Sequence, residues 1–357
     1  MRIDDSSIRV NRHTCIACGI CVDRCIMDNL RLSVAPCRQV CPVGMNCQGY
    51  IRLIAMDKEV QALDQLLSFG PFLGVIAATC NAPCENVCVR KKRDGAVHIF
   101  ELERYMAKKY SDKLNTVEIP QVLSGKSVVI VGTGISGLAC GFRAIQSGHS
   151  VTLYSRSFDE NEKTDVIKDI ITALENAGAA FLKHTDLKDD LADLKKYDAV
   201  ILSQLKDKLL IASDYFEITS DTEIDSPSHL LRDNIFCSDT GSSKKGSVYE
   251  IAESFETIES VNRFFNNEPF DWGRGFYTQD GAVKAYKTDP RVGSEEQRIA
   301  IEDLPDGFDK ETAKKQASRC FGCGRAFEKN QTCWYCLPCE LECPQGALDV
   351  AIPYLVK

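Results

Sequence analysis

The spacing of its cysteines constrains this chain more than any other feature. Eighteen cysteines occur in 357 residues, and only Cys140 and Cys237 stand alone. The others form four groups: Cys15, Cys18, Cys21 and Cys25; Cys37, Cys41 and Cys47; Cys80, Cys84 and Cys88; and Cys320, Cys323, Cys333, Cys336, Cys339 and Cys343. The first residues, MRIDDSSIRV, lack the apolar segment of a secretory signal, so we expect a cytoplasmic protein. Cysteines stay reduced there, and clustered reduced cysteines indicate metal binding.

Composition and charge exclude several other classes. A net charge of −8 and a pI near 5.3 oppose binding to nucleic acid, which requires concentrated Lys and Arg. The uncharged stretch 66–84 is long enough to span a membrane, but Gly70, Pro71 and Gly74 would interrupt its helix, so we expect no span. The basic run Arg90–Arg93 is interpreted as a solvated turn. The alternatives are a basic collar beside anionic clusters or a dock for an acidic ferredoxin.

Both ends of the chain carry the cysteine spacing of bacterial ferredoxins. Cys15-x-x-Cys18-x-x-Cys21-x-x-x-Cys25 has it with Ile26 in place of the usual proline, and Cys333-x-x-Cys336-x-x-Cys339-x-x-x-Cys343 has it with Pro344. In two-cluster ferredoxins, three cysteines of such a run bind one cubane and the fourth binds the other. We therefore predict one ferredoxin split between the chain ends. One cluster would use Cys15, Cys18, Cys21 and Cys343, and the other Cys333, Cys336, Cys339 and Cys25. Zinc, which typically joins two C-x₂₋₄-C units over a longer spacer, is the alternative.

A glycine-rich turn marks the middle of the chain. Gly132-Thr133-Gly134-Ile135-Ser136-Gly137 follows the expected strand Ser127–Val131 and opens a helix. In this context the glycines let backbone N–H groups and the helix N-terminus meet a pyrophosphate. Further apolar runs at Ser150–Tyr154 and Ala199–Leu202, with a helical segment at Lys163–Ala177, predict an α/β domain.

The remaining cysteines lie in a pattern with a recognisable counterpart. Pro36-Cys37-Arg38-Gln39-Val40-Cys41-Pro42 is followed by helical stretches, by Cys80-x-x-x-Cys84-Glu85-x-x-Cys88 and by Leu102-Glu103-Arg104. This pattern resembles the N-terminal cluster domain of the small subunit of NADPH-dependent glutamate synthase, which dihydropyrimidine dehydrogenase shares. The resemblance continues through the glycine-rich turn to about residue 265.

The resemblance implies two further clusters. One would be bound by Cys37 and Cys88 with a Cys-x-x-Cys pair, which this chain lacks immediately before Cys37. Cys320 and Cys323 have the character of that pair and are its expected substitute. The other cluster would be bound by Cys41, Cys80, Cys84 and Glu103. Cys47, Cys140 and Cys237 are left over, and each is interpreted as a small buried apolar residue.

The resemblance also implies FAD at the glycine-rich turn. The expected contacts are Gly132, Gly134, Ile135, Ser136 and Gly137, with Asp239 holding the ribityl chain. Ser155 stands where an acidic residue would bond the ribose hydroxyls, and a degenerate domain kept as a scaffold is the alternative. No second glycine-rich turn follows a strand between Arg156 and Asp239, so we expect no NAD(P) site.

Together these features predict an α/β protein with a helical iron–sulfur domain and a reduced Rossmann-like domain. The expected segments are 1–35, a ferredoxin-like half; 36–115, the helical iron–sulfur domain; 126–265, the FAD-type domain; 266–308, a linker; and 309–357, the second ferredoxin-like half. The predicted function is electron transfer by about four [4Fe–4S] clusters and FAD, without catalytic residues of its own. Its partners would be a catalytic oxidoreductase subunit or a ferredoxin in a hetero-oligomer. The alternatives are a self-contained NAD(P)H-dependent flavin oxidoreductase and a zinc-stapled scaffold.

Overall fold

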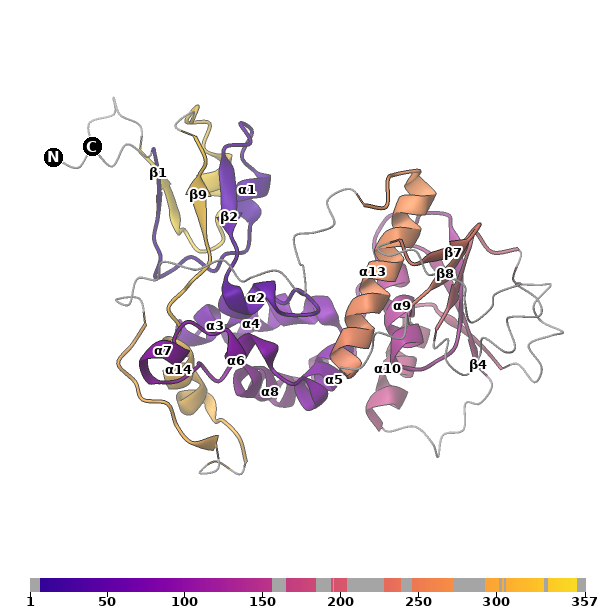
Figure 1. Cartoon of the computed structure of the whole chain (residues 1–357), viewed down its shortest axis with the longest axis horizontal. Coiled ribbons are helices and arrows are strands. Elements are labelled where there is room, and N and C mark those ends of the chain that lie inside the picture. The colour runs from indigo at the N-terminus through magenta and orange to yellow at the C-terminus, as the bar shows by residue number, and fades with distance from the viewer. Residues whose placement is uncertain are drawn as a thin grey trace. The chain divides into compact units, whose positions relative to one another are not determined.

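The computed structural model of this chain contains two compact units (Figure 1). It describes residues 7–155, 165–183, 194, 196–203, 228–238, 246–271, 293–301, 304, 306–330 and 333–351. Unit 1 contains those up to residue 68, those of 81–109 and those from 293 onwards, and unit 2 contains 69–80 and those of 110–271. Asp239 and residues 272–292 of the expected linker lie outside the described residues.

The two ends of the chain form one ferredoxin-like body within unit 1. Strand β1 (Ile8–Val10) pairs antiparallel with β10 (Leu348–Val350), and β2 (Leu30–Ser33) pairs antiparallel with β9 (Arg325–Glu328). Figure 1 shows the indigo β2 beside the yellow β9. The short helices α1 (Ile20–Asp23) and α15 (Pro338–Leu341) pack against each other. Ile8, Leu30, Leu348 and Val350 form the apolar core beneath the cysteine loops.

Short helices make up the rest of unit 1. They are α2 (Pro36–Gln39), α3 (Cys47–Ala55), α4 (Glu59–Leu66), α6 (Pro83–Asn86), α7 (Lys91–Asp94), α8 (Ile99–Lys109) and α14 (Lys310–Ser318). The 3₁₀ turn η1 (Leu67–Phe69) follows α4, and the 3₁₀ turn η2 (Ser111–Lys113), which follows α8, belongs to unit 2. Helix α3 is buried along most of its length and packs against α4 and α14. The helical pattern predicted from Tyr50 to Phe69 is broken at Asp57, whose φ of 61° ends α3. Lys310 and Lys314 of α14 hold the Asp57 carboxylate at 2.8 and 3.3 Å.

Unit 2 is built on a six-stranded sheet with the order β5-β4-β3-β6-β8-β7. Its strands are β3 (Ser127–Val131), β4 (Ser150–Ser155), β5 (Ala180–Lys183), β6 (Ala199–Leu202), β8 (Ile235–Cys237) and the antiparallel edge strand β7 (Leu230–Arg232). Helices α5 (Phe72–Thr79), α9 (Ile135–Gln146), α10 (Asp165–Asn176) and α13 (Ser247–Asn266) belong to the same unit. The prediction of a parallel α/β sheet is confirmed, and the order of the strands reverses beside β3, where such folds bind ligands.

The apolar stretch considered as a membrane segment is divided between elements. Among the described residues no single helix is long and apolar enough to cross a membrane. Residues Glu59–Phe69 and Phe72–Thr79 meet the length and composition requirement only when taken together across a sharp bend. In α5 the side chains of Phe72, Leu73 and Ile76 are buried, and the Phe72 ring packs 5.7 Å from that of Phe142.

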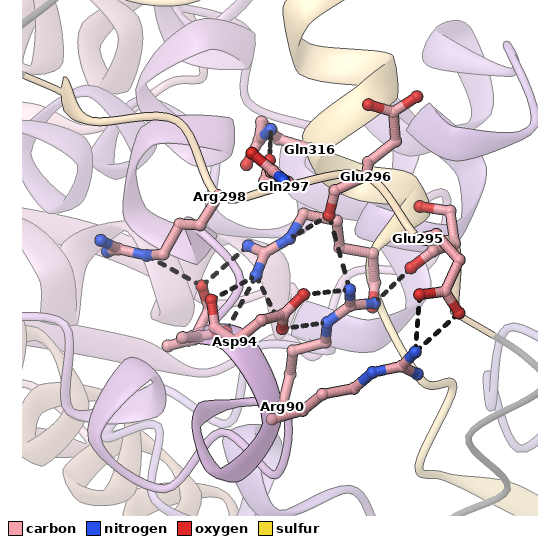
Figure 2. A network of polar contacts seen from close by, with 12 residues as sticks. Arg90, Asp94, Glu295, Glu296, Gln297, Arg298 and Gln316 are labelled. Atoms are coloured by element: carbon pink, nitrogen blue, oxygen red, sulfur yellow. Dashed lines mark hydrogen bonds and ion pairs between the residues drawn. The ribbon is translucent and has the colours of Figure 1, made fainter.

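A buried network around two arginines joins distant segments of unit 1 (Figure 2). The residues Arg90 and Arg319 are 1% and 0% exposed. Arg90 donates to both carboxylate oxygens of Asp94, at 2.6 and 2.5 Å, and to the carbonyls of Ser294 and Arg319. Arg319 donates to the same Asp94 carboxylate at 3.1 Å and to the carbonyls of residues 94, 95, 96 and 296. The interpretation of Arg90 as part of a solvated turn is therefore wrong, although Lys91 and Lys92 are exposed.

Removing the shared carboxylate should destabilise unit 1, because Asp94→Ala leaves two buried guanidinium groups without their anion. The Asp94 side chain is itself one-third exposed. We therefore expect the free energy of unfolding to fall by about 3 kcal/mol, the lower end of the range for breaking a buried ion pair. Arg90, then Arg319, lowers the pKa of Asp94 to about 2. The contribution of Asp94 is accordingly complete above about pH 4 and disappears as the pH falls towards 2. Urea unfolding of the two proteins measures the difference.

The matched control is Glu295→Ala, which removes an exposed ion pair with Arg93. Exposed pairs contribute about 0–1 kcal/mol, so this variant should unfold close to the unaltered protein. If both variants lowered the free energy of unfolding equally, the role assigned to Asp94 would be wrong.

Candidate iron–sulfur centres

The first group of thiols joins the two chain ends. Cys15, Cys18, Cys21 and Cys343 line one cavity in the ferredoxin-like body. Burial, and then the charges of Cys15 and Cys343, raise the pKa of Cys18. Burial, and then the charges of Cys18, Cys15 and Cys343, raise the pKa of Cys21 to about 12. The structure therefore brings together the first predicted set of four.

The second group mirrors the first and lies closer to solvent. Burial, and then the charges of Cys25, Cys333 and Cys336, raise the pKa of Cys339 to about 11. Cys336 is exposed, and Trp334 and Leu341 near it in the sequence are 72% and 78% exposed. Backbone N–H groups of Asn29 and Tyr335 approach the sulfurs of Cys25 and Cys333 at 3.3 and 3.5 Å. Such N–H groups stabilise thiolates, and the exposure of Cys336 gives this group a short path to the surface.

The third group combines cysteines of the helical segment with cysteines from near the C-terminus. Cys37, Cys88, Cys320 and Cys323 line a second cavity. Burial is the main reason that the pKa of Cys320 is raised to about 12, and the charges of Cys37 and Cys88 add to it. Cys320 and Cys323 therefore lie where a substitute for the missing pair is expected.

Two sets of hydrogen bonds hold the third group together. The Arg90–Asp94–Arg319 network fixes the loops that carry Cys88 and Cys320, because each arginine lies within two residues of one of them. On the other side of the cavity, the Gln48 amide donates to the Gly324 carbonyl at 2.7 Å and accepts from the Gly324 N–H. Helix α3 is thereby attached to the residue directly after Cys323.

The fourth group contains Cys41, Cys84 and a buried acid. Glu103 of α8 is 5% exposed, and its Oε1 atom has no hydrogen-bond partner among the described residues. Burial, and then the charge of Cys41, raise the pKa of Glu103 to about 8. A buried carboxyl oxygen without a partner is costly, so this position favours a cationic or metal partner. Cys80, the fourth predicted ligand, ends α5 and belongs to the other unit.

Cys47 lies among thiols that are predicted to bind two different clusters. It is 2% exposed, as expected for a buried apolar residue. Its thiol also interacts with those of Cys37, Cys41 and Cys84, and these contacts raise its pKa. No local pattern indicates this placement, because the spacing around Cys47 matches none of the cluster motifs. Across the described ranges, no three His, Cys, Asp or Glu side chains converge on the position of one metal ion.

The glycine-rich turn of unit 2 has the expected backbone form. Gly132 adopts a φ of 114° after β3, and α9 begins at Ile135. A Cβ atom on Gly137 would lie 2.0 Å from the Gly132 carbonyl oxygen, so only glycine fits there. The first N–H groups of α9 have no partner within the helix and are the donors that a phosphate would use.

The side chains around the turn are less open to a ligand. The buried Ser136 hydroxyl bonds those of Ser238 and Ser254 at 2.6 and 3.0 Å, so its backbone rather than its side chain suits a cofactor. Ser155 is the last residue of β4. The leftover cysteines of this unit, Cys140 and Cys237, are both fully buried, and the Cys140 Sγ atom lies 3.7 Å from the Ser254 carbonyl oxygen.

Part of this chain is similar in sequence to known proteins. Residues 15–114 match the family model described as dihydropyrimidine dehydrogenase domain II, 4Fe-4S cluster. The glutamate synthase [NADPH] small chain of Bacillus subtilis is 30% identical over 214 residues, which are 52% of this chain and 43% of the relative. The NADPH-Fe(3+) oxidoreductase subunit beta of Geobacter sulfurreducens is 34% identical over 122 residues, which are 34% of this chain and 18% of the relative.

A more distant relative carries the same name as the first. The glutamate synthase [NADPH] small chain of Mycobacterium tuberculosis is 27% identical over 154 residues, which are 43% of this chain and 29% of the relative. The chain thus spans less than half the length of each of these curated relatives. The resemblance inferred from the cysteine pattern is confirmed: this chain resembles the small subunit of glutamate synthase and the N-terminal part of dihydropyrimidine dehydrogenase, including its 4Fe-4S cluster domain.

Proposed function

We propose that this chain is an electron-transfer subunit that carries about four [4Fe–4S] clusters and relays electrons between a redox partner and a separate catalytic subunit. The observation that carries the proposal is the grouping of thiols from distant parts of the sequence around shared spaces. A cubane binds each of its four ligands through a different iron, so its ligands surround a space instead of meeting at one point. Each cluster, when bound, accepts and releases single electrons.

The proposed ligands follow the four groups. They are Cys15, Cys18, Cys21 and Cys343; Cys25, Cys333, Cys336 and Cys339; Cys37, Cys88, Cys320 and Cys323; and Cys41, Cys80, Cys84 and Glu103. The charge interactions among thiols support the first three sets, and the unpartnered Glu103 oxygen beside Cys41 supports the fourth.

We further propose FAD at the glycine-rich turn of unit 2. The strand order with β3 beside the reversal, the φ of Gly132 and the N–H groups at the start of α9 support it. A scaffold without cofactor is the alternative, because the Ser136 hydroxyl is engaged inside the unit. Bound flavin would exchange electrons with the clusters in single steps.

The partners are proposed from the same features. The second group, with exposed Cys336, Trp334 and Leu341, suits exchange with a protein partner, either a catalytic oxidoreductase subunit or a ferredoxin. Reduced cysteines in this number suit the cytoplasm. A self-contained NAD(P)H-dependent flavin oxidoreductase is the second candidate, because relatives named for NADPH match part of the chain.

Anaerobically purified protein should contain about sixteen irons per chain, because each of four cubanes holds four. It should be brown and lose colour on reduction by dithionite. Iron and acid-labile sulfide analysis measures the content. About eight irons would contradict either the ferredoxin-like pair or the other two clusters, and a colourless protein with stoichiometric zinc would indicate the scaffold.

The isolated chain should not oxidise NADH or NADPH at a useful rate, because its one glycine-rich turn is the one proposed for FAD. Anaerobic stopped-flow spectroscopy of the flavin and cluster bands tests this, with dithionite as the control reductant. Denaturation should release FAD. Rapid flavin reduction by NADPH alone would favour the self-contained enzyme. The absence of released flavin would indicate that the glycine-rich turn belongs to a scaffold without a cofactor.

Glu103→Ala should remove or shift one cluster signal and leave the others, because the fourth cluster would lose its only oxygen ligand. Glu103→Cys should restore that cluster at a different potential, since thiolate is a softer ligand than carboxylate. Iron content and EPR-monitored redox titration measure both effects. The control is Glu101→Ala, which removes a carboxylate of the same helix that pairs with Arg104 at 3.0 Å. Unchanged cluster signals in Glu103→Ala would make Cys47 the next candidate ligand.

A further inference from the structure

Arg52 is a buried cation with no anion beside it among the described residues. It lies on α3, where every residue from Cys47 to Ile54 is buried, and it is itself 5% exposed. Its Nε atom has no hydrogen-bond partner, and within the described ranges its side chain makes no hydrogen bond or ion pair. A guanidinium group keeps its proton in proteins, so burial cannot neutralise it. Burying such a charge is expensive unless a negative group accompanies it.

The position of Arg52 identifies that negative group. Gln48 and Ile51 of the same helix line the cavity of the third group, and Arg52, which is not itself a lining residue, lies one turn after Gln48 on the same side of α3. The positive charge of Arg52 also acts on the Cys320 thiol, where it opposes the larger effect of burial on the pKa. Two other buried arginines of this unit, Arg90 and Arg319, already share the Asp94 carboxylate.

We propose that Arg52 is the counter-ion of the cluster bound by Cys37, Cys88, Cys320 and Cys323, and that it raises the reduction potential of this cluster. The inference rests on the proposed function. A cubane held by four thiolates is anionic, and reduction by one electron adds one more negative charge. A fixed positive charge in a region of low dielectric therefore stabilises the reduced form more than the oxidised form. The electron comes from a neighbouring cluster or from dithionite, and no proton moves, because the guanidinium stays charged in both forms.

By this assignment, Arg52 changes the reduction potential of a cluster without binding iron itself. Among the cysteine groups, the fourth has the opposite arrangement, with the acid Glu103 beside Cys41. A cation at one cluster and an acid at the next would separate their potentials, and the electron would rest preferentially on the cluster beside Arg52.

The test compares Arg52→Gln and Arg52→Lys in the full-length, cluster-loaded protein. EPR-monitored redox titration measures each cluster, and Cys320→Ser identifies the signal of the third. Arg52→Gln should lower the reduction potential of the third cluster by at least about 59 mV, which corresponds to a tenfold change in the equilibrium constant of a one-electron reduction. Arg52→Lys keeps the charge and should retain most of the potential. Arg93→Gln, which removes an exposed guanidinium that pairs with Glu295, should change no potential.

The outcomes separate the inference from the function on which it rests. Unaltered protein without iron would defeat the proposed function itself. Unaltered protein with four clusters, combined with an unchanged third potential in Arg52→Gln, would overturn only the role of Arg52. If Arg52→Gln loses the third cluster, retention of that cluster near its normal potential in Arg52→Lys supports the inference. An equal loss in Arg52→Lys overturns it, since charge is then not the property that matters.

Discussion

The pairing of β1 with β10 and of β2 with β9 is the interaction on which the first two cysteine groups depend. These two short ladders hold the first and last cysteine runs against one core, and they set which thiols face each other. Without them, Cys343 would have no reason to lie beside Cys18 and Cys21. The Arg90–Asp94–Arg319 network performs the same task for Cys88 and Cys320. The first three groups are therefore assembled by tertiary contacts and not by their local loops alone.

The same contacts bury ionisable side chains at a cost in free energy, which cluster binding would reduce. Burial raises the pKa of Cys21 and of Cys320 to about 12, so these thiols hold their protons until a metal displaces them. Glu103 and Arg52 are buried with polar atoms that have no hydrogen-bond partner among the described residues. In the proposed function, a unit that buries an acid, a cation and many thiols would be more stable when clusters bind the acid and the thiols and their negative charge accompanies the cation. Folding and cluster insertion are for this reason coupled in the proposed function.

Sequence patterns predicted the structure correctly where the signal is local or repeated along the chain. The ferredoxin spacing predicted which cysteines of the two ends meet, and apolar runs located β3, β4 and β6. The resemblance placed Cys320 and Cys323 with Cys37. Local patterns failed where a distant partner decides the outcome. Arg90 looks solvated in a run of basic residues, yet Asp94 and two distant carbonyls bury it. Likewise, the break at Asp57 depends on a positive φ and on lysines of α14.

The division of the ferredoxin-like body between the two ends has a consequence for the order of events during synthesis. The ribosome delivers β1, β2 and the first four cysteines long before β9, β10 and Cys343 exist. Until then, the edges of β1 and β2 lack these partner strands and the early thiols face solvent, where exposed edges and hydrophobic surface favour aggregation. Neither proposed ferredoxin-type centre has its full set of ligands before Cys339 has emerged, and the first centre also requires Cys343. In the proposed function, cluster assembly in the ferredoxin-like body can therefore be completed only after its C-terminal strands and cysteines have been synthesised.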